Sequence, residues 1–128
     1  MDYPYWTILV AVLLPYIWSS LAAYYKYKMD GKIDVNTPRE QSARLDGAGK
    51  RANAAQSNAW EALGVYSACF LTAVVAGVEA DQIKLLAILW VVFRVLHGAS
   101  YVADIAKIRM FSFAAGMVCN ILIVTKAF

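Results

Sequence analysis

The sequence predicts an all-α integral membrane protein, folded as a bundle of four transmembrane helices. The chain has only 128 residues, of which 61% are hydrophobic and 16% are charged, and its mean hydropathy is +0.52. A soluble domain of this size could not bury so much apolar surface. The apolar residues are gathered in four long runs, which lack the alternating pattern that a membrane β-barrel requires.

One domain, 1–128, accommodates all four spans. A bilayer core of about 30 Å is crossed by about 20 helical residues, a length that the first three runs reach and the last just misses. The segment between the first two spans, 26–58, is expected to be partly helical. The expected spans are 5–25, 59–80, 83–103 and 110–125.

The first span is expected to remain in the mature protein, and a cleaved signal is the less favoured alternative. Asp2 precedes it without any lysine or arginine, whereas a secretory signal begins with a basic region. The apolar run also continues through aromatic residues as far as Tyr27. Pro15 lies inside this span, where neighbouring helices tolerate a kink.

The long connection carries two helix signals. Thr37 is expected to cap a short helix, with Pro38 in its first turn and Glu40 at the reciprocal capping position. From 50 to 63 there is no helix breaker. The second span is therefore expected to be the membrane end of a longer helix that begins outside the bilayer.

Basic residues predict the orientation. Nine of them lie in the segments 26–58 and 104–109, and two, Lys84 and Lys126, lie on the opposite side. By the positive-inside rule, both loops are cytoplasmic and both termini lie outside, in the inner or plasma membrane if the protein is bacterial. Because topology accounts for the net charge of +3, we expect membrane lipids and no nucleic acid as partners.

Small residues and thiols are interpreted as packing features. Cys69 and Cys119 lie within spans and show neither a pair spacing nor a metal motif. Small side chains at four-residue spacing let helices approach closely, within one chain or between chains. These sets are Gly64 with Ala68, Ala73 with Gly77, and Ser112 with Gly116 and Asn120.

The third span carries a polar stripe. Arg94, His97, Tyr101 and Asp104 occur at helical spacing, so that all four are expected on one face. An arginine within the hydrocarbon costs a few kcal/mol, and it therefore normally faces a bundle interior or a wet cavity. We expect this stripe to point inward.

The second span supplies complementary groups. Asn58 and Glu61 share a face, and Arg51 lies two turns earlier on roughly the same side. At about 1.5 Å per residue, His97 lies nearer than Arg94 to the level of Glu61. An ion pair between Glu61 and Arg94 is thus an option that the spacing does not require. A structural cluster and a functional site both fit these residues.

These motifs resemble the superfamily of membrane-associated proteins in eicosanoid and glutathione metabolism (MAPEG). Its second-helix signature is R-A followed by A-x-x-N-x-x-E, and microsomal glutathione transferases carry R-x-x-H-x-x-x-Y in the third helix. The chain is similar to bacterial members in particular. The matching residues are Arg51-Ala52, Ala55, Asn58 and Glu61 in the first pattern, Arg94, His97 and Tyr101 in the second, and then Arg109.

The resemblance implies a homotrimer with sites between subunits near the cytoplasmic side. Glutathione would be the co-substrate, and its thiolate would attack a lipophilic electrophile that arrives through the bilayer. Arg109 would stabilise the thiolate, with Tyr101 as a hydrogen-bond donor; no metal is implied. The residues implied to bind glutathione or brace the site are Arg51, Asn58, Glu61, Arg94 and His97.

Two other functions stay open. Many glutathione-binding members carry an arginine where this chain has Ala54, which favours a non-catalytic protein of the same fold that binds a lipid or a partner membrane protein. A small four-span exporter is the third reading. Such exporters usually need a carboxylate in the first span, and 5–25 contains no charged residue.

Overall fold

The computed structural model describes residues 2–128 as five helices, with no strand in that range. Four of the helices are long and apolar enough to cross a membrane, which confirms the all-α, four-span fold class. The helices are α1 (Trp6–Asp30), α2 (Pro38–Ala43), α3 (Gly47–Val75), α4 (Ala80–Val102) and α5 (Ala106–Thr125).

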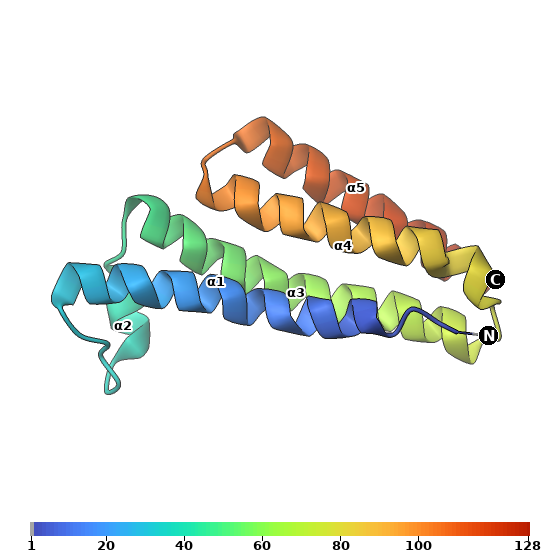
Figure 1. Ribbon diagram of the computed structural model, residues 1–128, viewed down its shortest axis with the longest axis horizontal. Coiled ribbons are helices and arrows are strands. Elements are labelled where there is room, and N and C mark those ends of the chain that lie inside the picture. Colours follow the sequence, from blue (N-terminus) through green and yellow to red (C-terminus); the bar gives the residue numbers. More distant parts are fainter. Residues whose placement is uncertain (1) are drawn as a thin grey trace.

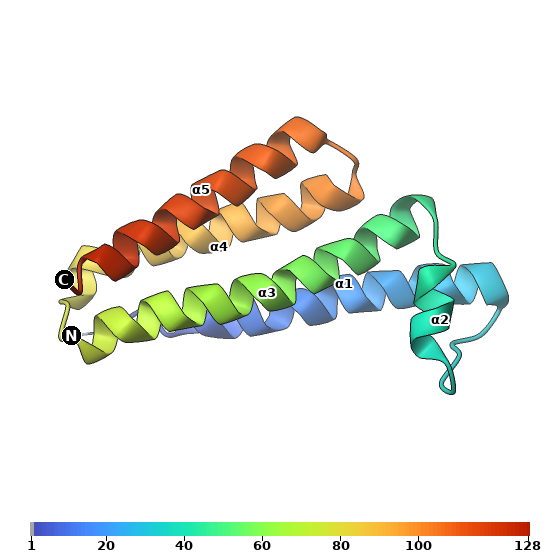
Figure 2. The same cartoon turned by 180° about the vertical axis from the view of Figure 1, so that it is seen from behind.

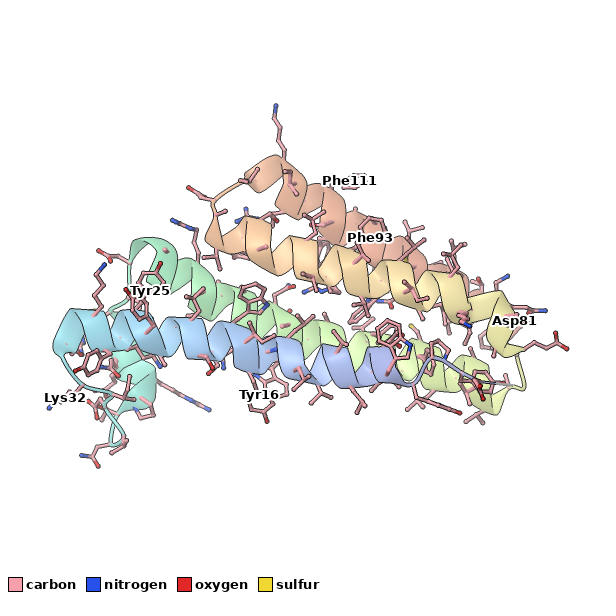
Figure 3. All side chains as sticks on the ribbon, in the orientation of Figure 1. Tyr16, Tyr25, Lys32, Asp81, Phe93 and Phe111 are labelled. Carbon is pink, nitrogen blue, oxygen red and sulfur yellow. The ribbon has the colours of Figure 1, made fainter. Side chains whose placement is uncertain are left out.

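The long helices form two antiparallel pairs, α1 with α3 and α4 with α5 (Figures 1 and 2). The two termini lie together with the α3–α4 turn at one end of the bundle, which we call the terminal end. The α4–α5 turn and the connection that contains α2 lie toward the other end, the loop end. Lys32 and Asp81 mark these two ends in Figure 3.

Three helices extend beyond the apolar runs. α1 continues to Asp30 and is closed by Gly31, whose φ of 72° is the left-handed conformation that glycine adopts readily. α3 begins at Gly47, well before its apolar part, as the absence of a breaker predicted. α5 begins at Ala106 and has 20 residues, enough to cross a bilayer. Lys107 and Arg109 are good helix formers that lengthen it.

Asp104 does not belong to the polar stripe. α4 ends at Val102, and Asp104 lies in the following turn with φ of 61° and an exposed side chain. The expected stripe assumed that the helix continued for one more turn. The prediction for Asp104 is therefore wrong.

The start of α2 also differs from the expected capping. Thr37 precedes the helix, but its side chain makes no capping hydrogen bond. Its hydroxyl instead donates to Oδ2 of Asp34 at 2.7 Å, and Oδ1 of Asp34 accepts the backbone N–H groups of Asn36 and Thr37. An aspartate turn thus orders the segment before α2.

A core of aromatic and aliphatic side chains holds the two pairs together near the terminal end. Tyr66 of α3 stacks on Trp90 of α4, with ring centroids 3.8 Å apart and an angle of 12°. The Tyr66 hydroxyl lies 2.5 Å from Oγ1 of Thr7, so this buried phenol is satisfied by α1. The core places α3 and α4 in fixed register, which positions the polar residues one to three turns further toward the loop end.

Candidate functional site

Two members of the polar stripe point into the bundle. Arg94 and His97 are only 5% and 3% exposed even in the single chain, which confirms the expectation that they face inward. Tyr101 is half-buried. Gly98, which lies between His97 and Tyr101 in the sequence, allows the indole of Trp18 on α1 to lie directly against α4. The stripe is thus fixed from both sides, by α3 and by α1.

Arg94 is held by an amide. Its Nη2 donates to Oδ1 of Asn58 on α3 at 2.6 Å. Glu61 is exposed and makes no ion pair with Arg94. The ion pair found within 2–128 joins Arg44 to Asp30. A direct Glu61–Arg94 pair is therefore not formed. The contact with the α3 motif is made by Arg94.

A hollow of about 110 Å³ lies between α3, α4 and α5, and we call it the inner hollow. Its floor is buried and its rim is exposed. Gly116 contributes to the room on the floor, because a methyl group there would lie 3.7 Å from Cδ of Arg94. The floor consists of Trp90, Arg94, Gly116 and Asn120, and the exposed rim includes Glu61, Val65, Phe113 and Met117.

A second hollow, of about 460 Å³, lies on the α4–α5 surface nearer the loop end, and we call it the outer hollow. The Arg109 guanidinium carbon lies 4.5 Å from the centroid of the Tyr101 ring, which is a cation–π contact. His97 lies edge-on to the same ring at 5.7 Å. Phe113 lines both hollows.

His97 contributes an unused acceptor or donor to this region. Its Nδ1 is buried and has no hydrogen-bond partner among residues 2–128. Buried polar atoms are rarely left unpaired in native proteins, so this nitrogen is an unusual feature of a residue that lines the outer hollow. The outer hollow therefore presents a cation, a phenol and an imidazole toward one space.

Arg51 makes a structural contact. Its Nε donates to the backbone carbonyl of Val102 at 3.0 Å. That carbonyl is one of the last four of α4, which have no partner within the helix, and a cation there complements the helix dipole. Arg51 thus ties α3 to the loop end of α4, apart from the residues that line the two hollows.

Sequence reasoning missed three contributors. Trp90 and Phe113 were indistinguishable from ordinary apolar residues of a span. Asn120 was noted only for its spacing, although an amide within a hydrocarbon-length run is a signal for a polar interior. Among residues 2–128 there is no group of three or more His, Cys, Asp or Glu side chains that could hold a metal ion.

In chemical terms, the two hollows combine cations with apolar walls. Such an arrangement suits a small anion held next to a lipophilic molecule. Searches of curated proteins and of solved structures found no match. The comparison with family models matches the MAPEG family over residues 3–128, essentially the whole chain. The chain therefore belongs to the MAPEG family, the membrane-associated proteins in eicosanoid and glutathione metabolism.

Proposed function

We propose that this protein is a glutathione-dependent transferase or peroxidase that acts on lipophilic electrophiles. The observation that carries the proposal is the outer hollow, where the Arg109 guanidinium lies over Tyr101 beside the buried His97. A cation with adjacent hydrogen-bond donors stabilises a thiolate over the thiol. The apolar residues Met110 and Ala114 line the same space and would receive the electrophile.

The proposed transferase step is a displacement or addition at carbon. The glutathione thiol releases its proton to solvent, and the sulfur anion stays beside Arg109. The sulfur then forms a bond to the electrophilic carbon. In a displacement, a leaving group departs with the electron pair of the broken bond; in an addition, the electron pair of the double bond takes a proton from water. Tyr101 donates a hydrogen bond to the sulfur before attack. In the peroxidase step, the thiolate attacks the terminal oxygen of a hydroperoxide, the O–O bond breaks, and the alkoxide leaves and takes a proton to become the alcohol. A second glutathione thiol then displaces water from the resulting sulfenic acid to form the disulfide.

The α3 motif would bind the rest of the tripeptide. Because Asn58 already satisfies Arg94, the carboxylate of Glu61 remains free for the amino group of glutathione. Arg94 retains further donors for a ligand carboxylate. Arg51 is partly engaged by Val102, so we expect it to brace the site more than to bind. His97 would contribute a hydrogen bond through its unpaired ring nitrogen.

We propose a homotrimer that packs through α3. One face of this helix is buried against the other helices, and the opposite face is exposed from Glu61 to Val75. Gly64 and Ala68 are small residues four positions apart on that face, and they would allow close helix approach. The exposed stripe contains Glu61, Gly64, Ala68, Leu71 and Val75.

Native mass spectrometry tests the assembly. Ala68→Trp places a large side chain on the stripe and should lower the trimer fraction. Val92→Trp places the same large side chain at a position on α4 that is 52% exposed, and it should leave assembly intact. Equal trimer fractions in the two variants would contradict the packing through α3.

The loop end would be cytoplasmic. The uneven distribution of basic residues supports this orientation. On intact cells, a thiol reagent that cannot cross membranes should label Lys84→Cys and spare Lys28→Cys. The reverse labelling would invert the topology, and with it the side from which glutathione enters.

Glutathione titration of the purified protein tests the activity. Ultraviolet thiolate absorbance and conjugation of a generic aromatic electrophile should both appear in the wild type. Arg109→Ala should abolish turnover and leave the oligomer intact. Lys107→Ala removes an exposed cation two residues away and should keep activity. Equal turnover in both variants would remove Arg109 from the catalytic role.

A non-catalytic member of the family is the second candidate. Two observations favour it: Ala54 stands where many glutathione-binding members carry arginine, and Arg51 donates to a backbone carbonyl, so it only partly replaces that arginine. An intact oligomer that forms no thiolate and turns over no electrophile would support this candidate.

A further inference from the structure

The connection between α1 and α2, residues 31–37, exposes aliphatic side chains outside the transmembrane helices, and we call it the connecting loop. Val35 is 83% exposed and Ile33 is 43% exposed. Apolar side chains that are grouped on a surface mark sites of contact with another protein or with a membrane. This pair on one short loop therefore indicates a surface that is covered in the working protein.

A buried glutamine holds the connecting loop in one conformation. Gln41 of α2 is fully buried, and its Nε2 donates to the backbone carbonyl of Lys32 at 2.9 Å. Its Oε1 accepts from the backbone N–H of Asp34, also at 2.9 Å. These two bonds fix the backbone on both sides of Ile33. Because the loop is already ordered, binding through its aliphatic side chains costs little further entropy.

The acidic groups of this region are satisfied within the chain. The Asp34 carboxylate accepts from the backbone N–H groups of Asn36 and Thr37 at 2.9 and 3.0 Å. Asp30, at the end of α1, is paired with Arg44 at 2.6 Å. Hydrogen bonds and an ion pair thus replace part of the water at both carboxylates. This reduces the desolvation cost when the loop contacts another surface.

The connecting loop projects sideways from the bundle. α2 lies across the loop end, and the loop extends past α1 on the side away from α4 and α5 (Figures 1 and 2). The long axis of a bundle that spans a bilayer runs roughly along the membrane normal, so a sideways projection follows the membrane surface. Irregular backbone does not occur in lipid-exposed hydrocarbon, so the loop would meet the headgroups.

Charge selects the kind of lipid surface. Lys28 and Lys32 are exposed near the aliphatic pair. The segment 26–51 as a whole contains seven basic and four acidic residues. Anionic headgroups attract basic residues that lie next to a membrane. Aliphatic side chains combined with lysines are also the combination that interfacial anchors use.

We propose that the connecting loop is an interfacial anchor that docks on an anionic lipid surface. Ile33 and Val35 enter the headgroup region, and the ammonium groups of Lys28 and Lys32 lie against lipid phosphates. Docking fixes the loop end of α1 at the level of the headgroups. It uses none of the residues assigned to glutathione, so it does not depend on the proposed transferase activity.

Spin labels in lipid nanodiscs test the docking. A keto amino acid replaces Val35 in the full chain and is coupled to a nitroxide, which leaves the native thiols of Cys69 and Cys119 unmodified. Oxygen partitions into lipid, whereas a neutral nickel chelate stays in water. The ratio of oxygen to nickel collisions should be several-fold higher at position 35 than for the same label in place of Asp46, an exposed residue just before α3.

A matched pair of variants tests the apolar contact. Ile33→Ser removes the neighbouring aliphatic side chain and should lower the collision ratio at position 35. Ile105→Ser removes an isoleucine of nearly equal exposure, 45%, just before α5. It lies outside the connecting loop and should leave the ratio unchanged.

A second set of variants tests the charge. A lysine beside an anionic membrane favours docking by roughly 5-fold in the equilibrium constant. Lys28→Gln and Lys32→Gln should each weaken docking by about that factor in nanodiscs that contain phosphatidylglycerol, and should have little effect in phosphatidylcholine alone. Lys84→Gln removes an exposed cation at the terminal end and should have no effect in either lipid.

Three results would overturn the proposal. Frequent nickel collisions at position 35 would show that the loop stays in water. Few collisions with either reagent would show that a second subunit covers it. A collision ratio that changes neither with Ile33→Ser nor with lipid charge would remove both parts of the anchor. No glutathione is present, and both faces of a nanodisc have the same lipids, so the outcome is independent of the proposed activity and orientation.

Discussion

Gly98→Ala perturbs the contact that holds α4 against α1. A methyl group at this position would overlap the indole of Trp18, at separations that real side chains do not show. Overpacking of this kind costs about 1–3 kcal/mol. Replacing a helical glycine by alanine returns up to about 1 kcal/mol. Because the methyl group would overlap several indole atoms, the upper end of the overpacking cost applies. After the helix gain is subtracted, we expect a net loss of about 2 kcal/mol in the free energy of unfolding, measured in mixed micelles with increasing denaturing detergent.

Two matched variants show whether the indole is the cause. Gly116→Ala adds the same methyl group on a packed face where the nearest atom lies at 3.7 Å, an ordinary contact, and it should raise the free energy of unfolding by up to about 1 kcal/mol. Trp18→Ala in the Gly98→Ala background removes the overlap, so the two changes should be strongly non-additive. The reasoning fails if Gly98→Ala is as stable as the wild type, or if the two effects add.

Three further measurements address other contacts. Thr7→Val leaves the buried Tyr66 hydroxyl without its partner and should lower the free energy of unfolding by about 1–3 kcal/mol; no loss would show that water replaces Thr7. The hydrogen bonds from Thr37 lower the pKa of Asp34, so their contribution is present above the ordinary value of 3.8 and is lost as pH falls through the lowered pKa. Amide exchange at Thr37 should accelerate there in the wild type and be fast throughout in Asp34→Ala, which has no side-chain acceptor. Arg51→Gln should destabilise the fold by about 1 kcal/mol with little effect on glutathione affinity, and a large loss of affinity at full stability would restore the binding role.

The order of the spans could be predicted because composition leaves little choice. A run of about 20 apolar residues crosses a bilayer as a helix, because the helix satisfies the backbone hydrogen bonds within the segment. The long reach of α3 into the loop region was also predictable, since 50–63 contains no residue that stops a helix. The end of α4 was not. Nothing in the residues after Val102 interrupts helical spacing as proline does, yet the chain turns there and Asp104 takes a positive φ.

The partner of Arg94 shows why the site was only partly predictable. Spacing along a helix predicts the depth of each residue in the membrane at about 1.5 Å per residue. By depth alone, His97 was expected nearer than Arg94 to the level of Glu61. Contact also depends on how each helix is rotated about its axis. The stacked Tyr66 and Trp90 set that rotation, and a sequence does not reveal which aromatic pairs will stack.

The α3 motif divides its work between the fold and the ligand, and this division can be measured. Asn58 points to the bundle and holds a buried guanidinium, so Asn58→Ala should cost about 1.5–3 kcal/mol of stability, as hydrogen bonds to charged groups do. Glu61 is three residues further along and exposed, so Glu61→Ala should leave the stability of the single chain unchanged and weaken glutathione binding or the trimer. If Glu61→Ala instead destabilises the monomeric fold while Asn58→Ala does not, then the roles of the two residues are reversed and the Arg94–Asn58 contact does not carry the buried charge.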